Sequence, residues 1–166
     1  MNKQSRKWYS RELTQRECDA MLKDNLVGTL SLLDGTRPYA VQLEYFYYNG
    51  ALYMATSVEG RKIDCLEKND RAVFTIFKDR ISHPEMIEQN VRCRSIMAEG
   101  RVETLLIKDV RTKRGDIYPF RLLKFTVEKW GSWQCNRKSC NQAAGIDTRK
   151  IILEWLQEAG YADSEK

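Results

Sequence analysis

Two adjacent cations, Arg61 and Lys62, lie in the stretch "SVEGRKIDCLEKND", where the pattern predicts the first turn of a helix. The free N–H groups of a first turn create partial positive charge, so cations are disfavoured there unless an anion binds. Arginine can bind a phosphate through two hydrogen bonds, and lysine adds a point charge. We therefore predict a phosphate-binding site at this turn. An alternative is that both cations point to solvent and pair with Glu59 or Asp64.

The residues just before this turn add further groups that suit an anion. Thr56 and Ser57 carry hydroxyl donors, and Gly60 has no side chain to keep a ligand away from the backbone. The apolar run of residues 51–56 predicts a strand that ends where these hydroxyl groups begin. A strand that passes directly into a helix therefore positions the predicted site.

Other residue types that could carry chemistry are sparse. The five cysteines are scattered and are expected to be reduced thiols, and Cys135 and Cys140 form a C-x4-C pattern where redox motifs have C-x-x-C. A structural zinc site requires four converging Cys or His ligands, and the one histidine, His83, lies beside Pro84 in a predicted loop. We predict no metal site and assign no general base.

The composition is typical of a globular protein, with 166 residues of which 42% are hydrophobic and 31% charged. This length suits one domain with a sizeable core. The 28 basic and 23 acidic residues are interleaved, which disfavours nucleic-acid binding despite a net charge of +5. No apolar run approaches the roughly 20 residues that span a bilayer, and the N-terminus lacks the apolar segment of a secretory signal. We expect no membrane association and a cytoplasmic location.

Helices are predicted near both ends of the chain. Thr14 and Glu17 form a capping-box pattern that is followed by an apolar stripe, so the first helix is expected over about residues 14–24. The second is expected over about residues 147–159, because an apolar stripe follows a capping aspartate and a glycine closes the segment. Its residues are the cap Asp147, the apolar Ile151, Ile152, Trp155 and Leu156, and the closing Gly160.

Strands are predicted between these helices. Segments rich in β-branched and aromatic residues are separated by Asp-Gly and Asn-Gly turns. In residues 38–47 the side chains alternate, with Val41, Leu43 and Tyr45 on one face. About six strands joined mostly by tight turns predict a small antiparallel barrel, in one domain of residues 1–166 with its core at about 25–130. The predicted strands are residues 27–33, 38–47, 51–56, 71–77, 91–105 and 120–130.

Three local signals refine this prediction. Gly100 predicts a bulge or sharp bend inside the long strand of residues 91–105. Asn69 predicts a left-handed end to the helix that begins near Arg61. The charged segment of residues 108–119 predicts one more helix, which would end at its proline.

The order of these elements resembles a known superfamily. Residues 28–77, "GTLSLLDGTRPYAVQLEYFYYNGALYMATSVEGRKIDCLEKNDRAVFTIF", resemble the nitroimidazole-resistance branch of the FMN-binding split-barrel superfamily. "RSIMAEGRVE" is similar to the strand with which pyridoxamine 5'-phosphate oxidases, members of the same superfamily, reach the flavin of the partner subunit. The resemblance covers roughly residues 25–105. It implies a mainly β fold, a six-stranded antiparallel split β-barrel with flanking helices, and a homodimer that holds FMN at its subunit interface.

The resemblance also implies which residues bind the cofactor. The two cations at the corner would hold the FMN phosphate, and the end of the preceding strand would line the phosphate and ribityl chain. An earlier strand would run along the isoalloxazine through its backbone, and the neighbouring subunit would add two residues. In that order the implied residues are Arg61 and Lys62; Ala55, Thr56 and Ser57; Tyr39, Ala40, Val41, Gln42, Leu43 and Glu44; and Arg94 and Ser95.

Two departures from the family pattern affect the implied activity. Ala55 stands where many nitroimidazole-resistance relatives carry a histidine, and Ser95 stands where pyridoxamine 5'-phosphate oxidases carry a glutamine. The C-terminal signature with which those oxidases bind their vitamin substrate is not evident. The resemblance thus implies an FMN-binding protein that acts as a flavin-dependent oxidoreductase on a small-molecule substrate or electron acceptor, with no catalytic residue assigned. Alternatives are a non-catalytic flavin carrier, sensor or storage protein, and a barrel without cofactor that serves as a binding module.

Overall fold

The computed structural model describes residues 10–79, 83, 85–88, 92–111, 113–135 and 148–159. The chain divides into two compact units. The larger unit, Arg11–Cys135, contains the sheet and the helices α2, α3 and α4, the last a single turn (Glu85–Glu88). The other unit contributes α5 (Thr148–Glu158), which agrees with the predicted C-terminal helix, although Asp147 and Gly160 lie outside the described residues. One domain over residues 1–166 stays a prediction.

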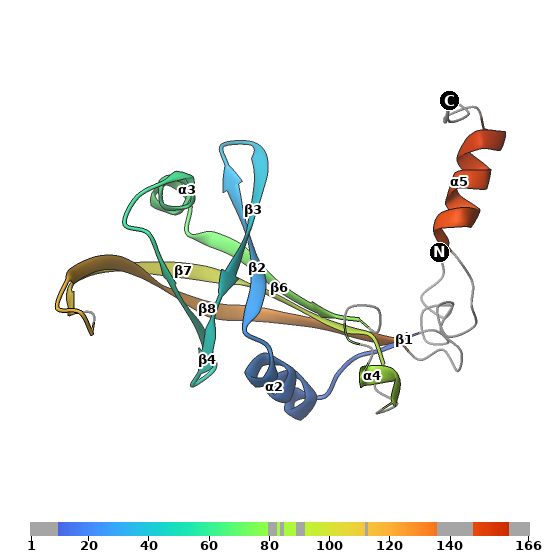
Figure 1. Ribbon diagram of the computed structural model, residues 1–166, viewed down its shortest axis with the longest axis horizontal. Coiled ribbons are helices and arrows are strands. Elements are labelled where there is room, and N and C mark those ends of the chain that lie inside the picture. The colour runs from blue at the N-terminus through green and yellow to red at the C-terminus, as the bar shows by residue number, and fades with distance from the viewer. Residues whose placement is uncertain are drawn as a thin grey trace. The chain divides into compact units, whose positions relative to one another are not determined.

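An eight-stranded antiparallel sheet forms most of the larger unit, in the order β3-β2-β6-β7-β8-β5-β4 with β1 paired to β8 (Figure 1). The predicted class is therefore confirmed, a mainly β split barrel with flanking helices, although the described residues form eight strands where six were predicted. The strands are β1 (Ser10–Arg11), β2 (Val27–Asp34), β3 (Arg37–Glu44), β4 (Phe46–Tyr48), β5 (Ala51–Thr56), β6 (Arg71–Lys78), β7 (Arg94–Arg111) and β8 (Ile117–Cys135).

The predicted strand 38–47 is interrupted at Tyr45, which separates β3 from β4. β3 pairs with β2 and β4 pairs with β5, so the two hairpins lie at opposite edges of the sheet order. The Tyr45 N–H donates to the Leu26 carbonyl (2.9 Å) and its hydroxyl to the Leu22 carbonyl (2.9 Å). Its ring packs edge-on against Phe74, with centroids 5.1 Å apart. Because consecutive residues join the two edges of the sheet, the sheet must curl at Tyr45.

Side chains alternate between the core and the surface along the strands. In β3, Val41 and Leu43 pack against the core beside buried Tyr45, whereas Gln42 and Glu44 are exposed, as the sequence predicts. The largest side chains that are fully buried come from several elements and form one apolar cluster with their neighbours. They include Met21, Leu22, Leu30, Leu52, Met54, Phe74, Ile96, Leu123 and Phe125.

α2 (Gln15–Asp24) begins with the predicted capping box. Glu17 N–H donates to the Thr14 hydroxyl (3.3 Å), and Thr14 N–H donates to the Glu17 carboxylate (2.8 Å). The guanidinium of Arg11 also donates to Glu17, and this bond is the main reason that the pKa of Glu17 falls to about 2. The helix buries its apolar stripe, including Leu22, whose carbonyl accepts the Tyr45 hydroxyl. α2 therefore packs against the point where the sheet curls.

α3 (Arg61–Lys68) follows β5 and buries Ile63 and Leu66 in the core. The predicted left-handed end at Asn69 is wrong, because this residue is extended, with φ −153° and ψ 115°. Its N–H donates to the Cys65 carbonyl (2.9 Å), and its side-chain oxygen accepts from the Arg71 N–H (3.0 Å). The chain thus passes from the helix directly into the extended backbone of β6. α2 and α3 lie at opposite ends of β2 (Figure 1).

β7 and β8 form one long hairpin, and the helix predicted over residues 108–119 is wrong. β7 continues to Arg111, Gly115 turns with φ 90°, and β8 begins at Ile117. Cross-strand pairing, with Val110 opposite Tyr118, replaces the local helical preference of the charged segment. The predicted irregularity at Gly100 is confirmed by a register shift between Glu99 and Gly100, where a Cβ would collide with the backbone of β8.

Removing the Tyr45 hydroxyl should destabilise the fold. In Tyr45→Phe the buried Leu22 carbonyl loses its donor, so the free energy of unfolding should fall by about 1–2 kcal/mol. Urea denaturation followed by circular dichroism measures this change. Tyr48→Phe is the matched control, because Tyr48 is 56% exposed and its substitution should change stability by less than about 0.5 kcal/mol. Equal losses in the two variants would contradict the assigned role.

Candidate functional site

The corner between β5 and α3 presents an open helix N-terminus. Gly60 precedes α3 with φ 119° and ψ 169°, a conformation that favours glycine, and no side chain caps the helix. The N–H groups of Ile63 and Asp64 donate to the Gly60 carbonyl, at 2.8 and 3.1 Å. The N–H groups of Arg61 and Lys62 precede these bonds and remain available to a ligand. The helix has eight residues, so its aligned peptide dipoles place a partial positive charge at this N-terminus.

Arg61 is held in place by residues of the β2–β3 hairpin. Its Nε donates to Asp34 Oδ2 (2.9 Å), and its guanidinium lies over the Tyr39 ring, 4.5 Å from the centroid. The pairing with Glu59 or Asp64 that the sequence left open is therefore absent among the described residues. Within the described residues, only Nε of this guanidinium is hydrogen-bonded. Both terminal nitrogens can therefore bind an oxyanion while Asp34 fixes the side chain.

Lys62 is the cation at this corner that lacks an anion. Its side chain is half-buried, and burial lowers its pKa. It makes no ion pair or hydrogen bond among the described residues. An ammonium group that has lost part of its hydration is costly unless an anion replaces the water. Lys62 therefore favours an anion beside the uncapped end of α3.

The three residues at the end of β5 do not play equal parts. Ala55 is exposed and lies opposite Leu122, and strand alternation places it on the other face from Thr56. Thr56 is half-buried at the corner. The Ser57 hydroxyl donates to the Glu59 carbonyl (2.8 Å), so in this conformation its proton is used within the turn. Among these three residues, Thr56 therefore has the hydroxyl group that can donate to a ligand.

Arg121 is a third cation at this corner, and no sequence pattern predicted it. It lies on β8 directly opposite Thr56, and its side chain is 23% exposed. Its Nε donates to the Val58 carbonyl (3.1 Å), and Nη2 lies 3.6 Å from Glu67 on α3. The one local signal is a cation inside the otherwise apolar run "FRLL". Its relevance depends on the pairing of β5 with β8, which no local pattern reveals.

The predicted residues of β3 lie on an edge strand. Tyr39, Val41 and Leu43 pack inward, and Tyr39 joins the corner through its contact with Arg61. Ala40, Gln42 and Glu44 are exposed beside β2. Among the described strands β3 has a neighbour on one side only, so within this part of the chain its other side presents free backbone groups. The strand can therefore contact a planar ligand through its backbone.

Arg94 and Ser95 lie far from the corner within the same chain. Leu106 on β7 is opposite Arg121, whereas Arg94 pairs with Gln134 at the other end of the hairpin. The separation corresponds to roughly 40 Å of strand. The buried Nε of Arg94 has no hydrogen-bond partner in the described residues. A single chain therefore does not bring Arg94 to the corner, and the buried Nε of Arg94 lacks an acceptor among the described residues.

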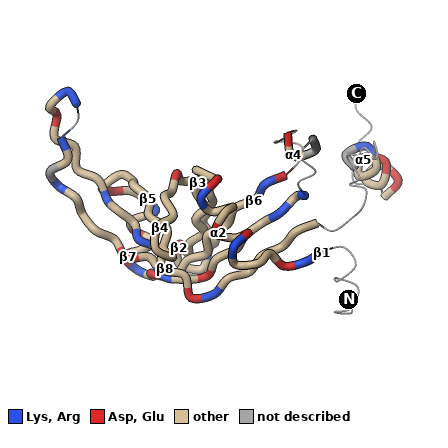
Figure 2. Tube along the Cα trace, turned by 90° about the horizontal axis from the view of Figure 1, so that it is seen from below, with Lys and Arg blue, Asp and Glu red and all other residues tan. Residues whose placement is uncertain are grey.

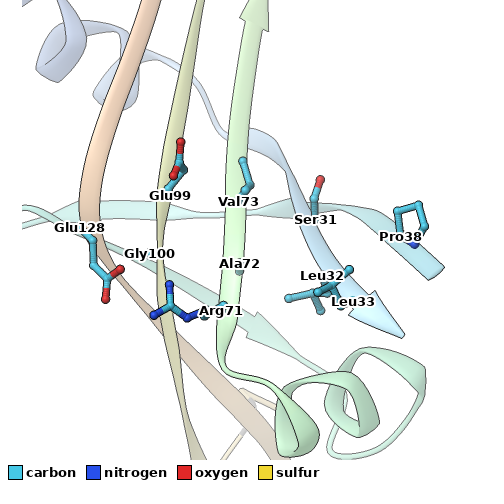
Figure 3. Close-up of a pocket in the computed structure, with 10 residues that line it drawn as sticks. All are labelled: Ser31, Leu32, Leu33, Pro38, Arg71, Ala72, Val73, Glu99, Gly100 and Glu128. Atoms are coloured by element: carbon cyan, nitrogen blue, oxygen red, sulfur yellow. The ribbon is translucent and has the colours of Figure 1, made fainter. Parts of the chain in front are cut away.

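A hollow of about 410 Å³ opens on the surface of β2, β6, β7 and β8 (Figure 3). It contains none of the predicted site residues. Two carboxylates lie on it, Glu99 paired with Lys129 at 3.1 Å and Glu128 paired with Arg101 at 2.9 Å. None of the residues that line it begins a helix, so the corner with the uncapped N-terminus of α3 is the better anion site. The lining residues are Ser31, Leu32, Leu33, Pro38, Arg71, Ala72, Val73, Glu99, Gly100 and Glu128.

The long strands carry mixed charge. Cationic and anionic residues are interspersed along β7 and β8 (Figure 2), and several pair across the strands, such as Lys124 with Glu103 at 3.5 Å. Among the described residues there is no group of three metal-ligating side chains. None of the described helices is long and apolar enough to cross a membrane.

Comparison with known proteins shows the family. The family model for pyridoxamine 5'-phosphate oxidase matches residues 14–137, so the chain belongs to that family. No curated protein matches the chain.

Solved structures share the fold at low sequence identity. A FAD-binding protein from Mesorhizobium loti is 22% identical over 77% of this chain and 98% of its own, with a TM-score of 0.58. A putative 5-nitroimidazole antibiotic resistance protein from Bacteroides thetaiotaomicron is 17% identical over 76% and 89%, with a TM-score of 0.57. A FAD and heme binding protein from Mycobacterium smegmatis is 14% identical over 82% and 78%, with a TM-score of 0.56.

Replacing Lys62 should stabilise the ligand-free protein. Lys62→Met removes the cost of burying an ammonium group, so the free energy of unfolding should rise by about 0.5 kcal/mol. Lys68→Met, on the exposed side of α3, is the matched control.

The gain should depend on pH in one direction. Because the folded pKa of Lys62 is lowered, the cost is full below that pKa and disappears as pH rises from it towards the ordinary value of 10.5. The difference in the free energy of unfolding between variant and wild type should therefore be largest near neutrality and should disappear at high pH. Urea denaturation at several pH values measures it, and a constant difference would contradict the assigned burial.

Proposed function

We propose that this protein binds FMN and that its β5–α3 corner holds the phosphate. The observation that carries this proposal is the half-buried Lys62, which lacks an anion among the described residues beside an uncapped helix N-terminus. Membership of the pyridoxamine 5'-phosphate oxidase family supports a flavin, as do structural relatives named as FAD-binding.

The residues at the corner fit a phosphate monoester. Arg61 would supply its terminal nitrogens, Lys62 its ammonium, and the first N–H groups of α3 would point at the phosphate oxygens. Thr56 adds a hydroxyl, and Arg121 adds positive charge from β8. FMN ends in a phosphate monoester that carries nearly two negative charges. This set of cations suits such a dianion better than it suits an anion of one charge. The free side of β3 would then contact the ring system.

We propose further that the functional unit is a homodimer. Arg94 and Ser95 lie roughly 40 Å along the strand from the corner of their own chain, so they can reach a flavin there only from a second copy. The unpartnered buried Nε of Arg94 supports a missing acceptor at this position. The free thiols of Cys18, Cys65, Cys93 and Cys135 support a cytoplasmic location.

The proposed activity is flavin-dependent oxidation or reduction of a small molecule. When bound, FMN would supply the electron chemistry, and this chain would bind it, orient it and donate hydrogen bonds. One observation favours a second candidate, a non-catalytic flavin carrier or sensor. The exposed Ala55 stands where many nitroimidazole-resistance relatives carry a histidine, and it offers no group that exchanges a proton.

Removing both corner cations should weaken FMN binding. Arg61→Ala with Lys62→Ala deletes two charge-assisted contacts, so affinity should fall by about 3 kcal/mol, or more than about 100-fold. Quenching of FMN fluorescence on titration measures this loss. Arg16→Ala with Lys23→Ala is the matched control, because it removes the same charge from exposed positions on α2. Unchanged affinity in a folded corner variant would refute the phosphate site, and preference for FAD over FMN would refute the choice of cofactor.

The enzyme and the carrier differ in turnover. We expect NADH or NADPH to bleach the absorbance of bound flavin near 450 nm, and a quinone or nitro compound to restore it repeatedly. Stopped-flow absorbance measures both half-reactions. Bleaching without repeated turnover across a panel of acceptors would favour the carrier, while the binding proposal would stand.

A further inference from the structure

Two cysteines that lie 42 positions apart in the sequence face each other at the open end of the β7–β8 hairpin. The Cys135 N–H donates to the Cys93 carbonyl at 2.9 Å. The neighbouring pair in the register is Arg94 with Gln134, so Cys93 and Cys135 continue the same ladder by one step. Both are free thiols in the structure. The pairing of β7 with β8 therefore creates a dithiol that the sequence spacing does not suggest.

The backbone geometry of this pair suits a disulfide. Opposed residues that share a ladder hydrogen bond have Cα atoms about 5.5 Å apart, with side chains on the same face of the sheet. Disulfides span Cα separations of about 4.4–6.8 Å, so this pair meets the Cα requirement. The two Cβ atoms of a hydrogen-bonded pair lie about 5 Å apart, and the disulfide draws them to about 4 Å by a small local adjustment at the strand ends. The backbone hydrogen bond joins Cys135 to Cys93, while Cys140 lies outside the described residues.

The accessibility of the cysteines also distinguishes this pair. Cys93 and Cys135 are half-buried, which leaves a path for a small reagent. Cys18 and Cys65 are buried in the core, and burial raises the pKa of both thiols. A raised pKa reduces the thiolate that attacks a disulfide. Among the four described cysteines, Cys93 and Cys135 are therefore the two that are both accessible to a reagent and adjacent to each other.

We propose that Cys93 and Cys135 are a redox modification site that closes into a reversible cross-strand disulfide. The oxidant is a low-molecular-weight disulfide such as oxidised glutathione. One cysteine thiolate attacks it, forms a mixed disulfide and releases one small thiol. The second cysteine thiolate then attacks the sulfur of the first cysteine in this mixed disulfide, forms the Cys93–Cys135 bond and releases the second small thiol. The two cysteines lose two electrons and two protons, and the oxidant becomes two small thiols.

The disulfide would fix the hairpin where its pairing begins. Arg94 and Ser95 follow Cys93 immediately, and Trp133 and Gln134 precede Cys135. A covalent link one step outside these pairs prevents the strand ends from separating. Oxidation would thus hold Arg94, with its buried unpartnered Nε, in a fixed position. The proposed site does not depend on flavin binding.

The test is peptide mapping after oxidation of the folded full chain with oxidised glutathione. Trypsin cleaves after lysine and arginine, so it places the three relevant cysteines in separate peptides. Cys93 lies in residues 93–94, Cys135 in residues 130–137 and Cys140 in residues 139–149. We expect a linked peptide of residues 93–94 with residues 130–137, and loss of the link on reduction. Thiol titration in denaturant should show two fewer free thiols from this link.

Variants and an unfolded sample serve as controls. Cys140→Ser should form the same link in the same yield, whereas Cys93→Ser should leave Cys135 as a glutathione adduct. Oxidation in strong denaturant should not favour the link, because the strands are then unpaired. A Cys135–Cys140 link in the folded protein would overturn the proposal. Glutathione adducts on both Cys93 and Cys135 without a link between them would also overturn it.

Discussion

The closure of the sheet depends on Tyr45. Its backbone N–H donates to the carbonyl of Leu26 between α2 and β2, its hydroxyl donates to the carbonyl of Leu22 in α2, and its ring lies against Phe74 in the core. These contacts bend the chain between two strands that would otherwise form one. β3 then stays with β2, and β4 crosses to β5 at the opposite edge. A buried donor that lost its acceptor would be costly, so the bend is strongly specified.

The candidate site follows from this closure. The end of the β2–β3 hairpin supplies Asp34 and Tyr39, which fix Arg61 from two sides. The pairing of β5 with β8 places Arg121 beside Thr56. The corner therefore collects charge from elements that are distant in the sequence, while α3 keeps its first N–H groups open. The same long hairpin carries Arg94 away from the corner of its own chain.

Sequence patterns predict the structure correctly where hydrogen bonds between residues close in the sequence determine it. The capping box at Thr14 and the irregularity at Gly100 are present as predicted, because each depends on adjacent backbone. The helix over residues 108–119 and the left-handed Asn69 were wrong. Within residues 108–119, the pairing of β7 with β8 outweighs a weak local helical preference. Asn69 is extended because it leads from α3 directly into β6 and accepts the Arg71 N–H. Tyr45 looked like one more inward residue of a strand, because alternation does not reveal where a strand changes partner.

The chemical content of the corner follows from the order of residues along the chain: a strand, two hydroxyls, a glycine and two cations at the start of a helix. The same order also determines which faces of the strands are apolar. The partners of these groups depend on the folded sheet: Asp34 for Arg61, Arg121 beside Thr56, and Cys93 opposite Cys135. The physical reason is that cross-strand register depends on how the whole sheet closes, and contacts set by closure leave no periodic trace along the chain.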